Sequence, residues 1–554
     1  MSKIMIPVGI ENFEMIRTNN FYYIDKTSFI VELVQDAFSV NLITRPRRFG
    51  KTLMMRMAES FFDIRKDNRT LFEGLEVTKY QNICDGWMNQ WPTLFVSFKD
   101  VAAENGFEDA YSMLAGIISD VCKEHIYLLD SQLIDENDKD TFIELKSQSA
   151  SKTDIKRSLL LLMRMMHAYY GKQVILLIDE YDVPLSKAND YGYYTQMLDV
   201  IRSMMGVALK TNDYLKFSVI TGCLRIAKES IFTGTNLFVM NSIYDGSYMD
   251  SFGFTEEEVK KLLADTGLTG QLPQMKRWYD GYHFGKSEIY CPWDVVNHVA
   301  ALQKNPDKKP GNYWRDTSHN NIIRAFIGNE KLYVNEKLEA LLSGGSVKSQ
   351  IRDNLTYGFE NATEDDFWSI LYLTGYLTMD GYDDDSDIAS LKIPNEEVRM
   401  IFADTVVEWF KDTMRAMNQT PLMEALWNGR ADEASVMISR ILRNTISYHN
   451  YKEDYYHAFL AGIFTGVGYP VESDKEHGEG RPDIVVKDID NQRVIIIETK
   501  RSVDKEHMED ECVHAVNQIQ LQRYMEEYLE DYETVVCYGA AFYRKSCLIK
   551  VVEV

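Results

Sequence analysis

The hydrophobic pattern of the first 245 residues alternates between short apolar runs and longer amphipathic stretches. Four runs are apolar on both faces of an extended chain, which is typical of strands buried in a parallel sheet: VNLIT at 40–44, TLFVSF at 93–98, QVILLID at 173–179 and LKFSVITG at 215–222. Stretches with helical periodicity lie between them, at 52–62, 107–125 and 154–170. This alternation predicts an α/β domain with a parallel sheet over residues 1–245.

Residues 246–440 have a different pattern, in which amphipathic helical stretches dominate. FTEEEVKKLLADTG at 254–267 opens with Thr255 at an N-cap position and Glu258 three residues later, which is a capping box. The aromatic segment WYDGYHFG at 278–285 follows, and aromatic side chains at helical spacing are usually part of a core. We therefore expect a helical middle region that forms a lid.

The last part of the chain, residues 441–554, returns to short apolar strands. Helices and strands are expected in the order α-β-β-β-α-β-β: a helix at 454–466, strands at 468–473, 483–487 and 493–499, a helix at 507–530, and strands at 534–543 and 547–553. This order predicts a separate compact α/β domain at the C-terminal end of the chain.

Composition excludes several classes of protein. The 554 residues are 45% hydrophobic and 26% charged, which is ordinary for globular protein and leaves enough apolar material for several cores. The 60 Lys and Arg residues against 84 Asp and Glu residues give a formal net charge of −24. Because this charge opposes nonspecific binding to DNA or to anionic membranes, any contact with nucleic acid needs a local basic surface.

Two further features concern the compartment. The first residues, MSKIMIPVGIENF, lack the basic and apolar regions of a signal peptide, and the longest apolar runs are far shorter than the roughly 20 residues that span a bilayer. The seven cysteines form no C-x-x-C pair, so we expect reduced thiols rather than disulfides or a zinc site. These observations predict a cytoplasmic protein with no membrane partner.

RPRRFGKT at 45–52 follows a predicted strand and opens a predicted helix, as a phosphate-binding P-loop requires. We expect Gly50 and Lys51 to contact the phosphates of ATP, and the Thr52 hydroxyl to bind Mg²⁺. Arg45 stands where the P-loop pattern has its first glycine. Together with Arg47 and Arg48, which we assign to nucleotide binding, it makes the loop unusually cationic, and this suits a polyanion.

VILLIDEYD at 174–182 has the form of a Walker-B element, an apolar strand that ends in two acidic residues. Asp179 is expected to hold Mg²⁺, and Glu180 to orient or deprotonate the attacking water. A buried strand with acidic residues at its exit is the structural alternative. In FSVITGCLR at 217–225, Thr221 is a candidate for sensing the γ-phosphate, while Arg225 either stabilises transition-state charge or forms a surface ion pair.

These motifs resemble those of the AAA-ATPase-like family of prokaryotic proteins. The resemblance rests on segments between residues 4 and 290: YYIDKT at 22–27, RPRRFGKT at 45–52, IDEYDVP at 178–184, TGCLRIAKESIFTG at 221–234, FGFTEEEV at 252–259 and WYDGYHFG at 278–285. It implies a P-loop NTPase fold that uses ATP and Mg²⁺. Members commonly have a C-terminal domain of the PD-(D/E)XK nuclease superfamily, so the resemblance also implies a restriction-endonuclease-like fold at that end.

GRPDIVVKDIDNQRVIIIETK at 480–500 has the PD-(D/E)XK arrangement, with Asp483 before one strand and Glu498 and Lys500 on one face of the next. Two carboxylates from adjacent strands can share Mg²⁺ or Mn²⁺, and the Thr499 carbonyl is a further candidate ligand. Lys500 would position water or stabilise the phosphorane oxyanion. A hairpin with exposed Glu–Lys pairs is the alternative, but the VIII run predicts a buried strand.

Several nearby residues are less specific. Glu476 matches an acidic position of the family and is either a metal ligand or a solvated loop carboxylate. Gln520 and Tyr524, with Gln518 nearby, lie one turn apart on the expected helix. The resemblance implies that such a Gln-x-x-x-Tyr pair either supports the active site or packs Tyr524 into the core, and we expect the core. His457 is expected to be a histidine satisfied by its surroundings rather than a ligand.

The favoured hypothesis is an ATPase whose P-loop module gates a metal-dependent DNA nuclease, with ATP and DNA as partners and a homo-oligomer as a candidate assembly. The alternative is a nucleotide-switched module that binds DNA or protein without cutting. An ATPase with no nucleic-acid partner is the third hypothesis. Fusions of nucleases with ATPases often act against foreign DNA or in mobile elements, an association at the level of the fold.

Overall fold

In a computed structural model of the chain, the structure describes residues 4–36, 38–225, 238–314, 335–352, 355, 362–416, 420–443, 453–473 and 482–552. The chain forms two compact units, and each combines segments that are distant in sequence. The first unit contains residues 1–317 and 348–398, and the second contains residues 318–347 and 399–554. The sequence predicts three domains, at 1–245, 246–440 and 441–554, and these boundaries stay a prediction.

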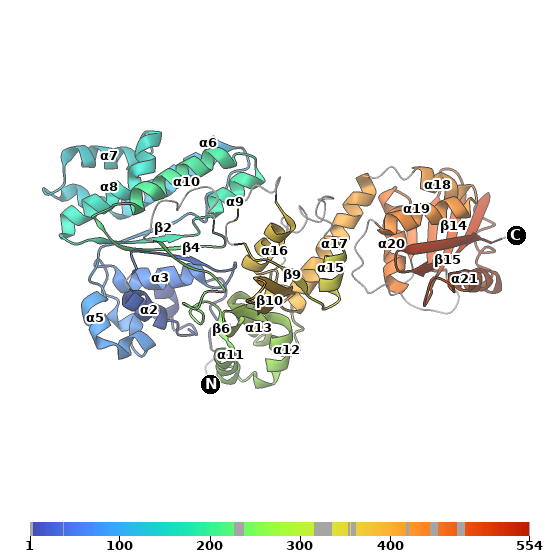
Figure 1. The fold of residues 1–554 in the computed structure, drawn as a ribbon, viewed down its shortest axis with the longest axis horizontal. Coiled ribbons are helices and arrows are strands. Elements are labelled where there is room, and N and C mark those ends of the chain that lie inside the picture. The colour runs from blue at the N-terminus through green and yellow to red at the C-terminus, as the bar shows by residue number, and fades with distance from the viewer. Residues whose placement is uncertain are drawn as a thin grey trace. The chain divides into compact units, whose positions relative to one another are not determined.

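A five-stranded parallel sheet forms the centre of the first unit (Figure 1). Its strands lie in the order β2-β3-β4-β1-β5, and their bounds are β1 Val40–Thr44, β2 Thr93–Ser97, β3 Val174–Asp179, β4 Leu215–Gly222 and β5 Phe238–Asn241. All neighbouring pairs are parallel. The predicted α/β class is therefore confirmed, and four of the five strands coincide with the apolar runs of the sequence.

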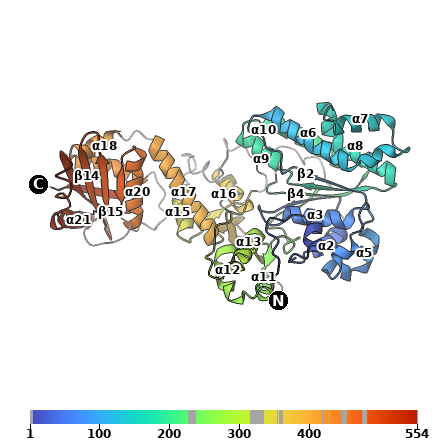
Figure 2. The same cartoon turned by 180° about the vertical axis from the view of Figure 1, so that it is seen from behind.

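Helices cover both faces of this sheet. The helices between Phe13 and Leu209 are α1 Phe13–Thr18, α2 Ser28–Asp36, α3 Lys51–Phe62, α4 Arg69–Phe72, α5 Gln81–Trp87, α6 Phe107–Glu124, α7 Glu136–Lys146, α8 Lys152–Tyr170, α9 Val183–Asp190 and α10 Tyr194–Leu209. Helices α6, α8 and α10 lie on one face and α2 and α3 on the other, as both views show (Figures 1 and 2). The three helices expected from periodicity are α3, α6 and α8.

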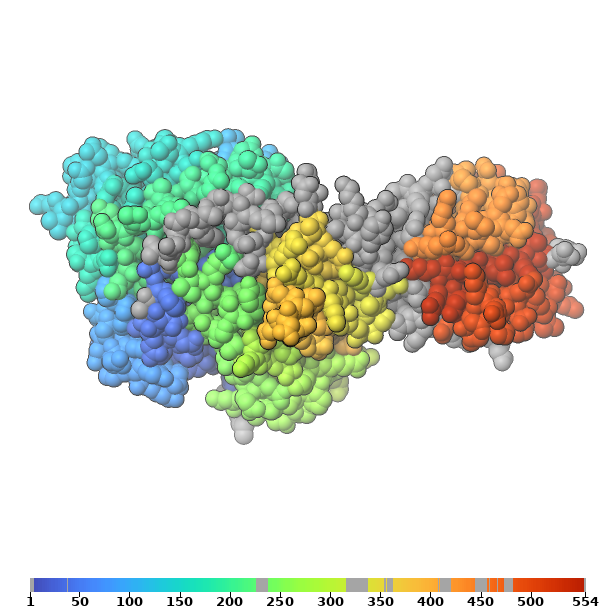
Figure 3. Space-filling view, viewed as in Figure 1, coloured from blue at the N-terminus to red at the C-terminus, as the bar shows by residue number. Residues whose placement is uncertain are grey.

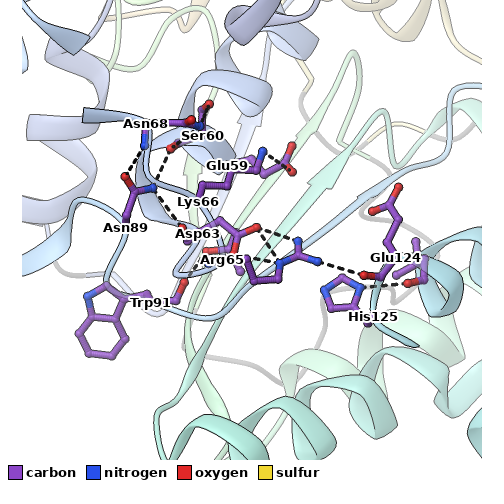
Figure 4. A network of polar contacts seen from close by, with 12 residues as sticks. Glu59, Ser60, Asp63, Arg65, Lys66, Asn68, Asn89, Trp91, Glu124 and His125 are labelled. Carbon is purple, nitrogen blue, oxygen red and sulfur yellow. Dashed lines mark hydrogen bonds and ion pairs between the residues drawn. The ribbon is translucent and has the colours of Figure 1, made fainter. Parts of the chain in front are cut away.

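A buried polar network fixes the far end of α3, the helix that follows the P-loop (Figure 4). The Asp63 carboxylate accepts hydrogen bonds from Arg65 Nε at 3.0 Å and Nη2 at 2.7 Å, and Arg65 Nη1 donates to the Glu124 carbonyl at the end of α6. The Asn89 amide donates to the carbonyls of Ser60 and Asp63 at 3.1 and 3.0 Å. These bonds connect α3 to the loop before β2 and to α6.

The rest of the first unit contains the expected helices and, in addition, short strands that the sequence did not predict. The helices are α11 Glu256–Asp265, α12 Leu272–Tyr279, α13 Pro292–Leu302, α16 Glu364–Leu373 and the first residues of α17 Glu396–Ala416. The strands form two small sheets, β6-β8-β7 and β10-β11-β9, with bounds β6 Phe254–Thr255, β7 Tyr282–Phe284, β8 Ser287–Tyr290, β9 Val347–Ser349, β10 Thr378–Asp383 and β11 Ile388–Lys392.

The capping box expected at Thr255 and Glu258 is present at the start of α11. Tyr282 and His283 lie in β7 rather than on a helix, because the chain reverses direction at Gly281 and Gly285, which both have positive φ. The His283 N–H donates to Thr378 Oγ1 of β10 at 3.0 Å. Residues of α16, β10 and β11 thereby lie beside the 250–302 segment on the surface of this unit (Figure 3).

The second unit is built around a five-stranded mixed sheet, in the order β12-β13-β14-β15-β16. Its elements are α15 Asn335–Leu342, α18 Thr420–Trp427, α19 Ala431–Arg443, α20 Glu453–Gly466, β12 Val471–Ser473, β13 Ile484–Asp488, β14 Arg493–Arg501, α21 Met508–Gln522, β15 Thr534–Tyr543 and β16 Ser546–Val551. Strands β14 and β15 are parallel, and the other pairs are antiparallel. The predicted α-β-β-β-α-β-β order from α20 onward is confirmed.

Alternating side chains of the central strands enter two cores, one on each face of this sheet. Ile484, Val486, Ile495 and Ile497 pack with α18, α19 and α20, whereas Val485, Val494 and Ile496 pack on the face covered by α21. The helix expected at 507–530 ends at Gln522 because Arg523 adopts a left-handed conformation with φ 55°.

None of the helices within the described ranges is long and apolar enough to cross a bilayer. All seven cysteines are free thiols.

Candidate nucleotide and metal sites

The RPRRFGKT loop connects the end of β1 to the start of α3, which is the geometry of a P-loop. Gly50 is the N-cap residue of α3 and has φ 82°, a left-handed conformation that glycine adopts without strain. Lys51 is the first residue of the helix, and its Nζ donates to the carbonyls of Arg45 and Pro46 at 3.2 and 3.1 Å. The lysine therefore lies inside the concave side of the loop, where a phosphate would be bound.

Asp179 at the end of β3 is the centre of a set of hydroxyl groups from three other segments. Its carboxylate accepts hydrogen bonds from Thr52 Oγ1 at 2.9 Å, Thr221 Oγ1 at 2.7 Å and Ser97 Oγ at 3.3 Å. Burial raises the pKa of Asp179, and the neighbouring Glu180 raises it further. Three of the predicted site residues thus meet, and Ser97, which the sequence analysis missed, is added to them.

Glu180 occupies the position directly after β3 with φ 54°, which is unusual for a residue with a side chain. Its N–H donates to Thr221 Oγ1 at 3.4 Å, and its carboxylate lies 3.3 Å from Lys51 Nζ. Burial by itself would lower the pKa of Lys51, but Cys223 and the carboxylates around it raise the pKa above its ordinary value. Lys51 is therefore a fixed positive charge beside Glu180.

The three loop arginines have different roles, which corrects the expectation that all three make the loop a cationic binding surface. Arg45 is fully buried, and its guanidinium donates to the carbonyls of Asn241 at 2.8 Å and Ser247 at 3.0 Å. Arg48 donates to the Tyr313 carbonyl at 2.8 Å. Both side chains therefore hold the loop against the rest of the first unit.

Arg47 of the loop has an electrostatic influence on Cys223, which lies next to Lys51. Burial raises the pKa of Cys223 to about 11, while Lys51 and Arg47 act in the opposite direction. Cys223 Sγ lies 3.5 Å from Lys51 Nζ. Arg47 thus acts on the same small region as Lys51.

The segment after β4 is held by the residues that follow Glu180, an arrangement that the sequence analysis did not predict. Asp182 Oδ2 accepts hydrogen bonds from the N–H groups of Cys223 and Leu224, both at 3.0 Å, and the Tyr181 hydroxyl donates to the Leu224 carbonyl at 2.7 Å. Arg225 follows directly and is partly buried. Residues 226–234, which belong to one of the motifs above, lie outside the described residues.

This arrangement fits a nucleotide with Mg²⁺. The Thr52 hydroxyl and the Asp179 carboxylate, already 2.9 Å apart, are the oxygen ligands that Mg²⁺ prefers. The N-terminus of α3 and Lys51 provide the positive field that phosphates need. Gly50 leaves the loop backbone open, because a Cβ there would meet nothing within 4 Å.

In the second unit, the residues of the PD-(D/E)XK pattern meet at the ends of β13 and β14. Asp483 directly precedes β13, and its Oδ2 accepts from the Thr499 N–H at 2.7 Å and the Thr499 hydroxyl at 2.8 Å. Glu498 Oε1 accepts from Lys500 Nζ at 2.9 Å. The antiparallel register, in which Ile484 is opposite Ile497, places Asp483 opposite Glu498.

The two carboxylates have opposite pKa shifts. Burial raises the pKa of Glu498, and the charge of Asp483 raises it further. For Asp483 the effect of burial is outweighed by hydrogen bonds from His457 and Thr499, which leave its pKa below the ordinary value. Paired carboxyl groups whose surroundings separate their pKa values in this way are typical of catalytic sites.

A divalent cation fits this pair of carboxylates. Glu498 is 1% exposed, and its Oε2 has no hydrogen-bond partner among the described residues. The hydrogen bonds from Thr499 and the close approach of His457 Nε2 all reach Asp483 Oδ2. A buried carboxylate oxygen without a partner is costly unless an ion satisfies it, so Glu498 Oε2 and Asp483 Oδ1 are the candidate ligand atoms.

His457, which was expected to be satisfied by its surroundings rather than to bind a metal, is brought by α20 to 3.2 Å from Asp483 Oδ2 through its Nε2. His457 and Asp483 are far apart in the sequence and meet only in the folded unit, so no local sequence motif predicts their contact. Gln520 and Tyr524 do not share a helix, since α21 ends between them, and Gln520 is exposed. Tyr524 is buried as expected. Glu476 lies outside the described residues.

Comparisons with known proteins agree with this division of the chain. Residues 7–232 match the family described as predicted AAA-ATPase, and residues 451–552 match the PD-(D/E)XK nuclease superfamily. A protein of Azotobacter chroococcum mcd 1, described as an uncharacterized protein in the vnfD 5'region, is 24% identical over 517 residues, which cover 90% of each chain. The chain therefore contains an N-terminal domain of the predicted AAA-ATPase family and a C-terminal domain of the PD-(D/E)XK nuclease superfamily.

Proposed function

We propose that this protein binds and hydrolyses ATP at the P-loop and cleaves DNA, with the help of Mg²⁺ or Mn²⁺, at the C-terminal site. In the first unit, Lys51 and Arg47 would bind the phosphates, and Thr52 and Asp179 would hold the metal. Glu180 would accept the proton of the attacking water, and Thr221 would fix both acidic residues through its hydroxyl. The Lys51–Glu180 distance of 3.3 Å supports this grouping.

In the second unit, Asp483 and Glu498 would hold a divalent cation, with the Thr499 carbonyl as a further ligand. When bound, such a cation supplies a nucleophilic hydroxide and neutralises charge on the phosphodiester. Lys500 would orient the attacking water or stabilise the negative charge of the transition state. His457 would act as a positioning residue, because its contact with Asp483 Oδ2 leaves Oδ1 to face the cation.

The single observation that supports a nuclease best is the buried, unpartnered Oε2 of Glu498 beside Asp483 and Lys500. Most buried polar side-chain atoms in folded proteins have a hydrogen-bond partner, so an unpartnered carboxylate oxygen beside a second carboxylate is a candidate cation ligand. DNA is the proposed substrate because phosphodiester hydrolysis is the chemistry that this set of groups serves.

Cleavage of supercoiled plasmid and of labelled linear and single-stranded DNA tests the proposal, in Mg²⁺ or Mn²⁺ and with and without ATP. We expect metal-dependent cleavage that Glu498→Gln lowers by at least about a hundredfold, since loss of even an outer partner of a metal ligand typically costs about 10- to 100-fold in metal affinity or activity. Glu472→Gln is the matched control, because Glu472 is an exposed residue of the same sheet that pairs only with Lys487 in the contacts described.

A non-cutting, nucleotide-switched binding module is the second candidate, and one observation favours it. The Lys500 ammonium group already forms an ion pair with Glu498 at 2.9 Å, so a cation has to compete with it. No cleavage under any condition, together with measurable ATP hydrolysis, would contradict the nuclease and support this module. Equal cleavage by the Glu498→Gln variant and the wild type would contradict the site assignment.

A further inference from the structure

The outer side of the P-loop is embedded in the later part of the first unit. Phe49 packs against Tyr282 and Phe284, with ring centroids 4.9 and 5.1 Å apart. A Cβ at Gly375 would come within 2.8 Å of the Pro46 side chain and 3.3 Å of Trp314. Because these contacts are close, the loop cannot change its shape unless the segments around it also move.

A short extended segment, Tyr313–Trp314, connects the P-loop to the first turn of α17. The Tyr313 carbonyl accepts from Arg48 Nη1 at 2.8 Å and from Trp293 Nε1 at 3.2 Å. The N–H groups of Tyr313 and Trp314 both donate to Glu397 Oε1, that of Trp314 at 2.9 Å. One peptide unit thus separates a loop guanidinium from a carboxylate of α17.

The charges along this connection depend on one another. Glu397 and Asp294, at the start of α13, are each 1% exposed and lie close enough for each charge to act on the other. Burial raises the pKa of both carboxyl groups, and the charge of Asp294 raises that of Glu397 further.

Arg48 provides the balancing positive charge from the P-loop. The other titratable groups around the pair are Cys291, Tyr279, Tyr282 and Tyr313, and burial raises the pKa of each of them. In a buried environment an unbalanced charge is costly, so a shift of Arg48 changes the stability of the Asp294–Glu397 pair.

Arg48 also has a backbone that can relax. Its φ is 69°, in the left-handed region that residues with side chains rarely adopt. The guanidinium lies over the rings of Trp293 and Trp314, at 5.7 Å from each centroid, and these contacts hold it in place. Strained residues of this kind are frequent in switch regions, where the surrounding contacts hold them in place.

We propose that Arg48, Tyr313–Trp314 and Glu397 transmit the nucleotide state of the P-loop to α17. This helix spans Glu396–Ala416, and the division between the two compact units falls within it, at residue 398. Movement of the loop on binding phosphate would shift Arg48, weaken the bonds to Glu397 and alter the first turn of α17. The inference rests on the proposed function and adds the route by which ATP would regulate the C-terminal site.

The test is the thermodynamic linkage between ATP and DNA. The affinity of the full chain for a fluorescent ATP analogue is measured with and without a DNA duplex, in Ca²⁺ to prevent cleavage. Coupled sites typically change each other's affinity by about 5- to 150-fold, and we expect the wild type to lie in this range. Glu397→Gln keeps an oxygen for the two N–H groups but removes the charge, and its ratio should fall below about twofold.

Glu396→Gln is the matched control, because it removes the same charge from the same turn of α17, where Glu396 lies 3.6 Å from Arg277. Asp294→Asn removes the other member of the buried pair and should lower the ratio in the same direction. Thermal unfolding of each variant verifies that it is folded.

The outcomes separate the inference from the proposed function. A wild-type ratio of one, or an unchanged ratio in folded Glu397→Gln and Asp294→Asn variants, would overturn the inference while leaving ATP and DNA binding intact. Failure of the wild type to bind ATP or DNA would instead refute the proposed function, and the inference with it.

Discussion

Buried ionisable side chains of the first unit are stabilised in their preferred protonation states by different neighbours. Asp179 is 0% exposed and is surrounded by three hydroxyl groups, whereas Lys51, 3% exposed, is held by two carbonyls and a carboxylate. His125, at the end of α6, is buried in its neutral form, and its Nδ1 lies 2.9 Å from the Val121 carbonyl. A buried group that loses its preferred protonation state destabilises the fold.

The His125 side chain predicts how the stability of the first unit depends on pH. Burial lowers the pKa of His125 to about 4, whereas an exposed histidine in the unfolded chain titrates near 6.5. The unfolded chain therefore binds a proton first as the pH falls, so the free energy of unfolding decreases. Between pH 7.5 and pH 5.5 the loss due to His125 is about 1–1.5 kcal/mol.

Urea denaturation in this pH range, which lies above the pI of about 4.9, measures the effect. His125→Gln should flatten the pH dependence, and His167→Gln, at a partly exposed histidine of α8, should keep the wild-type slope. If the His125→Gln slope equals that of the wild type, the burial of His125 in the neutral form is contradicted.

Among the elements, the ends of β1, β3 and β4 decide where the nucleotide site lies. Parallel pairing places Ile178 opposite Ile220 and Thr44 opposite Gly222, so the residues that follow these strands meet at one edge of the sheet. Gly222 is the point of closest approach, because a Cβ there would lie 2.6 Å from the Tyr181 ring and 2.7 Å from Asp182 Oδ1.

Gly222→Ala should therefore disturb the loop that holds Glu180. Tyr181 cannot move aside easily, since it is fully buried and bonded to the Leu224 carbonyl. We expect the free energy of unfolding to fall by about 1–3 kcal/mol and ATP hydrolysis to decrease with it. Urea denaturation and phosphate release measure the two effects. Gly206→Ala in α10, where a Cβ meets nothing within 4 Å, should be neutral or stabilising; similar behaviour of the two variants would contradict the close approach.

At the scale of the whole molecule, the second unit includes more of the chain than the nuclease motif suggests. Ser439 Oγ donates to the Cys547 carbonyl at 3.1 Å, and the Ile549 N–H donates to Ser435 Oγ at 2.8 Å, so α19 is bonded to the last strand. Leu422, Leu426 and Ile438 belong to the same core as the sheet residues Ile495 and Ile497.

This packing predicts the shortest stable C-terminal fragment. A fragment of residues 420–554 should unfold cooperatively in urea, as followed by circular dichroism. A fragment of residues 441–554, which begins at the boundary expected from the sequence, exposes the core face covered by α18 and α19. We expect it to lose several kcal/mol, roughly 1.5–3 kcal/mol for each large apolar side chain left uncovered, and to lack a cooperative transition. Equal stability of the two fragments would place the boundary at 441.

The sequence by itself determined four strands of the first sheet, the strands of the C-terminal sheet, the two candidate site motifs and the fold class. Buried strands such as 174–179 are continuous apolar runs, and the residues around Lys51 and around Glu498 lie within short local patterns. Local patterns of this kind depend on neighbouring residues only. They can therefore be recognised in the amino-acid sequence alone.

Only the tertiary structure decided which distant residues join these motifs. Arg48 looked like a phosphate ligand and Arg45 like part of a cationic loop because their charge is visible in the sequence, but both bond to carbonyls some 200 residues or more away. Cys223 and Glu397 gave no signal, since their contacts are with elements that are separate in the chain. The strands β6 to β11 were missed because each has only two to six residues and is stabilised by its partner strand rather than by its own pattern.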